Sequence, residues 1–250
     1  MIHTVRTYWR SFKRKWQIFK TVNWVKTIYF NFKKFPFSAA KKLPVFFFGK
    51  VKFTGLSGQV TINGPVKRAM ITFGQKFEFM KVSKGIAQFH LQGHLIFNGY
   101  THMAKDCLLY VGENAVCEFG NMSALGSDVK LICSHKITIG NWTGVGYESQ
   151  VLDTNSHPML NTETGKDYPM TNSVVLGDYN AISNRVSIMP GTKTSDNIVI
   201  ASNSVLNKDY TNLGSEVLIG GIPAKLIKSN FARNWEKERE DLIKYKVVKF

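Results

Sequence analysis

A six-residue repeat runs through LGDYNAISNRVSIMPGTKTSDNIVIASNSVLNKD, residues 176–209. Its positions are Leu176, Ile182, Ile188, Ile200 and Leu206, with Thr194 in the one remaining place. A period of six differs from the helical period of about 3.6 and from the simple alternation of a strand. It predicts a triangular coil with about eighteen residues a turn, in which three short strands each point one aliphatic side chain inward.

The same repeat occurs earlier in the chain, at Val111 and Cys117 and again at Ile139, Val145 and Val151. We expect Gly140-Asn141 and Asn180 to stand at corners of the coil, because these residue types tolerate a positive φ. From about residue 50 to residue 110 the pattern is less regular, although VKFTG, QVTING and HLIFNGY still predict short strands. A β-sandwich is the competing all-β fold, but alternation alone gives no reason for a strict phase of six.

The net charge of +16 is concentrated at one end of the chain. Residues 1–77 hold 16 of the 33 Lys and Arg residues and none of the 17 Asp and Glu residues. An apolar stripe at helical spacing is formed there by Val5, Trp9, Phe12, Trp16, Phe19 and Val22. A Trp-rich face bordered by cations suits an anionic membrane surface, so we expect peripheral attachment through residues 1–40. Alternatively, this face packs against the rest of the protein or a neighbouring subunit.

The sequence also bears on the compartment of the protein. Its longest apolar run, LPVFFF at 43–48, is much shorter than the ~20 residues that span a bilayer. The N-terminal aromatics are interrupted by Lys and Arg, unlike the apolar region of a signal peptide. We therefore expect a cytoplasmic location, peripheral on the inner face of the cell membrane. Cys107, Cys117 and Cys133 are predicted to be reduced core residues.

One long polar segment interrupts the repeat between Val151 and Leu176. A loop of this length in a regular coil is more often functional than idle. It contains His157, which is preceded by Asp153 and Asn155 and followed by a proline. Near the C-terminus, SNFARNWEKEREDLIKYK predicts a closing helix.

Three motifs resemble those of the hexapeptide-repeat acyltransferases, and more narrowly those of sugar O-acetyltransferases of surface-polysaccharide pathways. They are DTNSHP at 153–158, IVIASNSVLNKD at 198–209 and GGIPAKLIK at 220–228. The resemblance covers residues 105–228 strongly and implies an all-β, left-handed parallel β-helix. It divides the chain into a basic amphipathic segment at 1–45, a β-helix at 46–212 with an inserted loop at 153–173, and a C-terminal CoA-proximal segment with a helix at 213–250.

The resemblance also implies acetyl transfer from acetyl-CoA to a sugar hydroxyl. An ordinary imidazole is largely neutral at cellular pH, so His157 is the expected general base, and transfer is direct. Asp153 or Asn155 orients the imidazole or binds the acceptor. The implied CoA-binding residues are Ser183, Asn184, Ala201, Ser202, Asn207, Lys208, Lys225 and Lys228. The chain departs from the family pattern at 180–183, where NAIS replaces Val-Trp-Ile-Gly. A homotrimer is also implied, with the active site between two subunits.

Other functions stay open at this point. The same histidine serves an N-acyltransferase acting on an amino sugar or nucleotide sugar, and the fold also suits a non-catalytic β-helix scaffold at the membrane surface. No metal site is expected, because His3, His90, His94, His102 and His135 read as surface or strand positions. We expect no nucleic-acid partner, since the N-terminal aromatics follow a helical stripe and no recognition module is visible.

Overall fold

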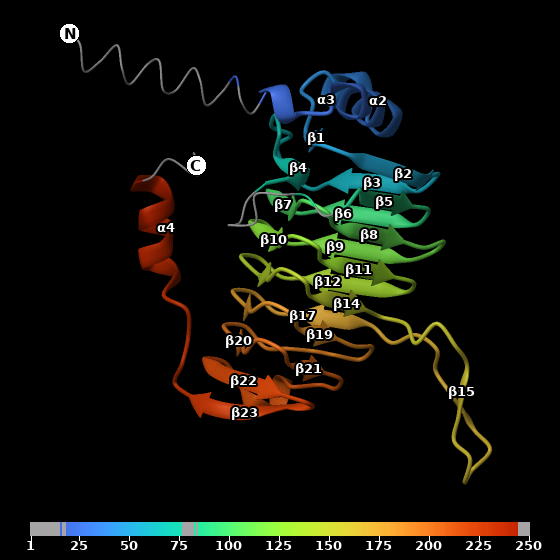
Figure 1. Ribbon diagram of the computed structural model, residues 1–250, viewed down its shortest axis with the longest axis vertical. Coiled ribbons are helices and arrows are strands. Elements are labelled where there is room, and N and C mark those ends of the chain that lie inside the picture. Colours follow the sequence, from blue (N-terminus) through green and yellow to red (C-terminus); the bar gives the residue numbers. More distant parts are fainter. Residues whose placement is uncertain (1–15, 17–18, 77–82, 84, 245–250) are drawn as a thin grey trace.

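The computed structural model describes residues 16, 19–76, 83 and 85–244. Its strands form a coil with three flat sides, shown in Figure 1. Successive strands visit the three sides in rotation, and strands on the same side pair in parallel with those of the next turn. The predicted parallel β-helix is therefore confirmed.

The three sides are defined by their strands. Side I is the nine-stranded sheet of β1 (Val45–Phe47), β4 (Ile71–Gln75), β7 (Thr101–Ala104), β10 (Ser123–Leu125), β13 (Gly144–Val145), β18 (Ala181–Ile182), β20 (Val199–Ile200), β22 (Val217–Gly221) and β23 (Ala224–Ser229). Side II comprises β2 (Val51–Leu56), β5 (Ala87–Leu91), β8 (Leu108–Val111), β11 (Lys130–Cys133), β14 (Gln150–Leu152), β19 (Ser187–Ile188) and β21 (Val205–Leu206). Side III comprises β3 (Gln59–Ile62), β6 (His94–Phe97), β9 (Val116–Phe119), β12 (Lys136–Ile139) and β17 (Val174–Leu176).

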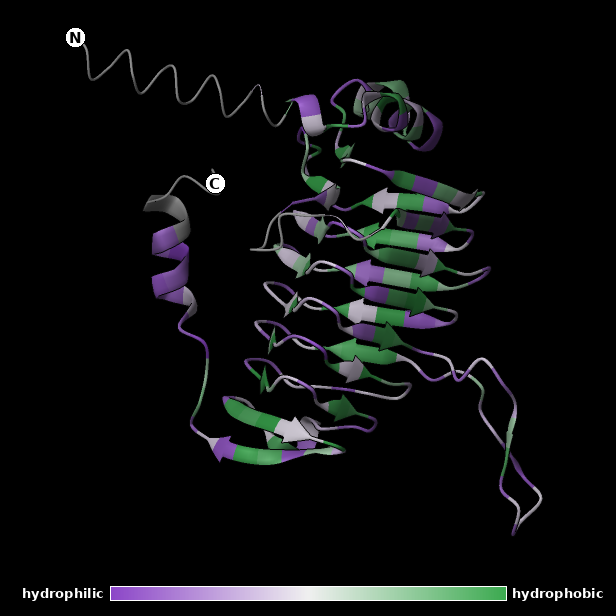
Figure 2. Cartoon of the chain, in the orientation of Figure 1, coloured by the Kyte–Doolittle hydropathy of each residue, from purple (hydrophilic) through white to green (hydrophobic). Residues whose placement is uncertain are grey.

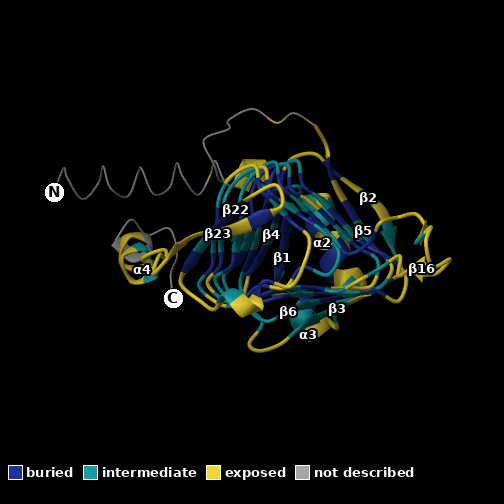
Figure 3. Cartoon of the chain, turned by 90° about the horizontal axis from the view of Figure 1, so that it is seen from below, coloured by how far each residue is buried: buried dark blue, intermediate teal, exposed yellow. Residues whose placement is uncertain are grey.

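The repeat positions are buried inside the coil. Figure 3 views the coil along its axis and shows buried residues, in dark blue, in the strands that form its sides. All of the predicted inward positions are buried, namely Val111, Cys117, Ile139, Val145, Val151, Leu176, Ile182, Ile188, Thr194, Ile200 and Leu206. Each fully buried aliphatic side chain contributes roughly 1.5–3 kcal/mol to the stability of the folded state. The earlier turns use larger residues, and Phe47, Phe73 and Phe89 pack with ring centroids 5.3–5.8 Å apart. These bulky aromatics explain why the repeat is less regular before residue 110.

The corners differ in one respect from the sequence prediction. The positive φ angles belong to Trp142 (55°) and Tyr179 (57°), not to Gly140-Asn141 or Asn180. Gly140 is instead required by close stacking, since a Cβ there would lie 2.4 Å from the carbonyl oxygen of Gly177 in the next turn. Asn180 is fully buried and its side chain bonds within the coil.

Side chains also connect successive turns at the corner between sides III and I. The Oδ1 atom of Asn141 accepts a hydrogen bond from the N–H of Asn121 at 2.8 Å, and Asp178 accepts one from the N–H of Asn141 at 2.7 Å. Asp196 repeats the contact with Asp178 at 2.7 Å. This ladder satisfies backbone donors where the chain leaves a strand.

A helical cap covers the first turn of the coil (Figure 1). It contains α2 (Trp24–Lys34) and α3 (Phe37–Ala40). Of the predicted apolar stripe, Val5, Trp9 and Phe12 lie outside the described residues, while Trp16 and Phe19 are exposed. The prediction is wrong for Val22, which is not part of the helical stripe. It is buried and forms an antiparallel bridge with Phe48. No helix among the described residues is both long and apolar enough to cross a bilayer.

The C-terminal end of the coil is closed by η1 (Thr211–Leu213) and by the antiparallel pair of β22 and β23. The predicted closing helix is present as α4 (Trp235–Lys244). Trp235 holds this helix against the coil, because its indole N–H donates to the Tyr179 carbonyl at 3.1 Å and its ring packs on Trp142 and Tyr179.

The cysteines and four histidines belong to the coil, while His3 lies outside the described residues. Cys107, Cys117 and Cys133 are buried, as predicted. His90 and His94 lie on β5 and β6, which belong to different sides of the coil. Among the described residues, no group of three or more His, Cys, Asp or Glu side chains is placed to hold a metal ion.

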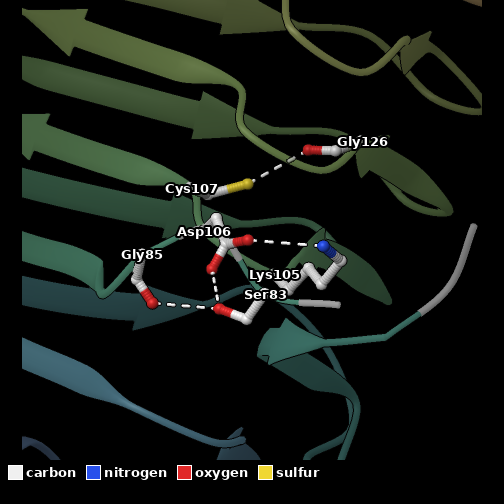
Figure 4. A network of polar contacts seen from close by, with 6 residues as sticks. All are labelled: Ser83, Gly85, Lys105, Asp106, Cys107 and Gly126. Carbon is white, nitrogen blue, oxygen red and sulfur yellow. Dashed lines mark hydrogen bonds and ion pairs between the residues drawn. The ribbon is translucent and has the colours of Figure 1, made fainter. Parts of the chain in front are cut away.

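A polar cluster stabilises the corner between β7 and β8 (Figure 4). Asp106 adopts a positive φ of 62°, accepts a hydrogen bond from the Ser83 hydroxyl, and pairs with the buried Lys105 at 3.3 Å. The Cys107 thiol donates to the Gly126 carbonyl of the next turn at 3.1 Å. These contacts hold one turn of the coil to the next and pair the charge of the buried lysine.

Candidate active site

The polar segment 153–173 leaves the coil between β14 and β17, at the corner of sides II and III, and projects from it as an arm (Figure 1). The arm is an antiparallel hairpin of β15 (Met159–Leu160) and β16 (Asp167–Tyr168). Its turn is held by Asn161, whose Oδ1 atom accepts from the N–H groups of Glu163 and Thr164, each at 3.0 Å. These two bonds close the turn of the hairpin.

Asp153 anchors the root of the arm. Its side chain is fully buried, and its two carboxylate oxygens accept hydrogen bonds from the N–H groups of Ser134 at 2.7 Å and His135 at 2.8 Å. A buried carboxylate is stabilised when backbone donors surround it. The structure thus brings Asp153 to the turn after β11, and not to the imidazole of His157.

His157 lies on the outgoing limb of the arm, just before β15, and is exposed. It follows Ser156, which has a positive φ of 59° and whose N–H donates to the Thr154 hydroxyl at 3.0 Å. Asn155 is also exposed, and its N–H donates across the hairpin to the Met170 carbonyl at 2.9 Å. Within the described part of the chain, no hydrogen bond holds the imidazole, so its orientation is open to a substrate or a second subunit.

A hollow of ≈ 460 Å³ lies between the root of the arm and the outer face of side II. It is lined by Leu108, Tyr110, Ile132, Ser134, Thr154, Ser156, Met170 and Thr171. Four hydroxyl-bearing side chains of serine and threonine surround an apolar floor that includes one aromatic ring. Ser156 precedes His157 directly, so the hollow adjoins the candidate base. Sequence reasoning missed these residues because they come from three turns of the coil, and only the strand register brings them together.

Four of the predicted CoA-binding residues lie at a different corner. Ser183 and Asn184 follow β18, and Ala201 and Ser202 follow β20, so all four stand where side I turns into side II. They stack in neighbouring turns, because the Ser202 hydroxyl donates to Asn184 Oδ1 at 2.7 Å. The N–H groups of Ser183 and Ala201 already donate within the coil, to Ile200 and Ile219.

The other four predicted residues lie elsewhere. Asn207 and Lys208 follow β21 at the corner of sides II and III, and both are exposed. Lys225 and Lys228 are exposed on β23 at the end of side I. Side II therefore separates the arm from the corner that carries Ser183 and Ser202. Asn207 and Lys208 share the corner of the arm, but one chain alone does not bring His157 to Ser183 and Ser202.

No protein-family model matches the chain. The crystal structure of NeuO, a polySia specific acetyltransferase, matches with a TM-score of 0.54 and 19% identity over 74% of this chain and 72% of that chain. OatWY, a polysialic acid O-acetyltransferase, matches with a TM-score of 0.40 and 20% identity over 74% and 90%. A hexapeptide-repeat acetyltransferase from Vibrio cholerae, VCA0836, matches with a TM-score of 0.40 and 22% identity over 52% and 64%. The likeness to NeuO shows that this chain has the fold of that acetyltransferase, the left-handed parallel β-helix.

Proposed function

We propose that the protein is an acetyl-CoA-dependent O-acetyltransferase that acts on a sugar hydroxyl of a surface or capsular polysaccharide or its precursor. The observation that carries this proposal is the arm, which presents an exposed histidine beside a hydroxyl-lined hollow at one corner of the coil. The shared fold with NeuO, a polySia specific acetyltransferase, supports the same reaction and a polymeric glycan acceptor.

The active form in this proposal is a homotrimer, because one chain leaves the site incomplete. Met159, Leu160, Tyr168 and Met170 all expose apolar surface on the arm. Exposed apolar groups on a projecting element are typical of a subunit contact. Residues 154–161, if extended, span on the order of 25 Å, which is enough to reach a neighbouring coil. The arm of one subunit then meets the corner of its neighbour that carries Ser183 and Ser202.

The reaction proceeds by direct transfer. The acceptor sugar binds in the hollow, where the hydroxyls of Ser134, Ser156 and Thr171 match its own hydroxyls and Tyr110 offers a ring face. His157 takes the proton of the attacking hydroxyl as its oxygen adds to the thioester carbonyl. The tetrahedral intermediate then releases the CoA sulfur, and the imidazolium returns the proton to it. The products are the acetyl ester and CoA thiol.

Free thiol release tests the proposal. The full chain is incubated with acetyl-CoA and with a panel of glycans that includes polysialic acid, and thiol is measured over time. Removal of a general base costs roughly 10²–10⁴-fold in rate, so His157→Ala should lower thiol release by at least a hundredfold. His135→Ala is the matched control, because it also removes an exposed imidazole and should keep the wild-type rate.

The possible outcomes separate the alternatives. Equal thiol release by His157→Ala and the wild type would show that another group is the base. Release with amino sugars or nucleotide-linked amino sugars, but not with hydroxyl acceptors, would favour N-acyl transfer. A wild-type protein that binds no acetyl-CoA and releases no thiol with either class would favour a non-catalytic scaffold.

A further inference from the structure

The cap helix α2 turns its polar face toward the protein. Thr27 and Asn31 are fully buried: the Thr27 hydroxyl accepts from the Phe47 N–H at 3.0 Å, and the Asn31 amide both accepts from and donates to the backbone of Val45. One turn further, the Lys34 ammonium donates to the carbonyls of Leu56 and Gly58 at 2.7 and 2.5 Å.

This inward polarity has a clear physical cause. The first turn of the coil has no preceding turn, so the strand edge of β1 would leave N–H and C=O groups without partners. Side chains of α2 satisfy these groups, and only Phe30 on this face enters the apolar core. The helix therefore caps the coil mainly by hydrogen bonding.

The opposite face of α2 carries the apolar side chains and is open to solvent. Val25, Ile28, Tyr29 and Phe32 are 79%, 48%, 50% and 48% exposed. Their spacing of i, i+3, i+4 and i+7 makes one continuous stripe, which we call the outer stripe. Phe37 extends it and is 71% exposed. Helices on water-facing surfaces show the reverse arrangement, so folding of this chain does not account for the stripe.

Positive charge surrounds the outer stripe. Lys33, Lys41 and Lys42 are exposed in or beside the cap, and residues 1–77 contain no Asp or Glu. Hydropathy along α2 and α3 is correspondingly mixed (Figure 2). A second copy of the same cap would bring like charges together without an acidic partner, which opposes cap-to-cap pairing. An apolar stripe edged by cations matches instead the headgroup boundary of a bilayer that contains anionic lipid.

We propose that the outer stripe docks on an anionic membrane surface, with α2 lying in the plane of the headgroups. The stripe enters the boundary between headgroups and acyl chains, while the surrounding lysines contact lipid phosphates. Trp16 and Phe19, which are also exposed and stack at 5.6 Å, add aromatic surface next to Trp24. This surface is independent of the arm and of the proposed acetyl transfer.

Vesicle co-sedimentation tests the docking surface. The full chain is mixed with vesicles of phosphatidylcholine alone or with phosphatidylglycerol added, and the bound fraction is measured against lipid concentration. We expect binding to the anionic vesicles, weakened by 0.5 M NaCl because salt screens exposed charges. Ile28→Ser/Phe32→Ser should bind at least about tenfold more weakly, since it removes apolar surface that enters the boundary. Lys41→Glu/Lys42→Glu should also lose about tenfold.

Controls keep the test specific to the cap. Ile86→Ser removes an apolar side chain that is 53% exposed on another part of the coil, and it should bind like the wild type. Circular dichroism melting checks that each variant is folded, as expected for substitutions of exposed residues. Wild-type protein that stays in solution with anionic vesicles would overturn the proposal. Equal binding by Ile28→Ser/Phe32→Ser and the wild type would also overturn it, because another segment would then hold the lipid.

Discussion

His102 makes the stability of the coil depend on pH. It lies on β7, with Nδ1 2.7 Å from the Thr72 hydroxyl, and burial lowers its pKa from 6.5 to about 4. Because the folded pKa is depressed, the unfolded chain binds the proton first as the pH falls. The native state should therefore lose stability from pH 6.5 down to pH 4, by on the order of 3 kcal/mol from this residue.

The variant His102→Gln isolates this contribution. It keeps a polar group near Thr72 and removes the titration, so its free energy of unfolding should vary less between pH 7 and pH 4 than that of the wild type. Urea unfolding at several pH values measures the difference. If the free energies of unfolding of the two proteins vary with pH in the same way, His102 is not the source of the pH dependence.

The residue types predict which side chains point into the coil, but they do not predict the backbone conformation at its corners. Repeat positions such as Ile188 and Leu206 were predictable, because the only requirement on them is an apolar side chain that points inward. The corner conformations were not, since the strict stacking of turns places the positive φ at Trp142 and Tyr179, residue types that give no signal for it. Asp153 belongs to the same short motif as His157. Only the structure shows that its buried carboxylate binds the backbone of the preceding turn and so anchors the arm.

The sequence predicts that the arm leaves the coil, but it does not predict the surface that the arm forms. The repeat ends at Val151 and resumes at Leu176, so the interruption of the six-residue repeat locates the arm in the sequence. Its hairpin pairing and the hollow at its root depend on contacts between residues of different turns, which a period along the chain does not report. The cap helix is a similar case: apolar spacing fits a helix but leaves open which face points inward, and the open edge of β1 turns the polar face of α2 toward the coil.

The exposed apolar residues of the arm lead to a prediction about assembly. Leu160 and Tyr168 lie on the two strands of the hairpin and contribute to its apolar surface. Leu160→Ser/Tyr168→Ser should raise the concentration at which the trimer dissociates by at least about tenfold, because apolar area is lost from each of three equivalent contacts. Sedimentation velocity over a concentration series measures this. A wild-type chain that is monomeric at all concentrations would contradict the proposed trimer.

The outer stripe docks without the arm, but assembly of the proposed trimer should strengthen its binding to a membrane. The cap lies at one end of the coil and the arm leaves its side, so a trimer with its threefold axis along the coils would present three outer stripes to the same plane (Figure 1). Three linked contacts bind a surface more tightly than one by effective concentration, commonly by 10²-fold or more. Leu160→Ser/Tyr168→Ser should therefore bind anionic vesicles more weakly than the wild type although its cap is unchanged, and the deficit should shrink at protein concentrations that restore the trimer. Equal vesicle affinity of monomer and trimer would show that the three caps do not face one membrane together.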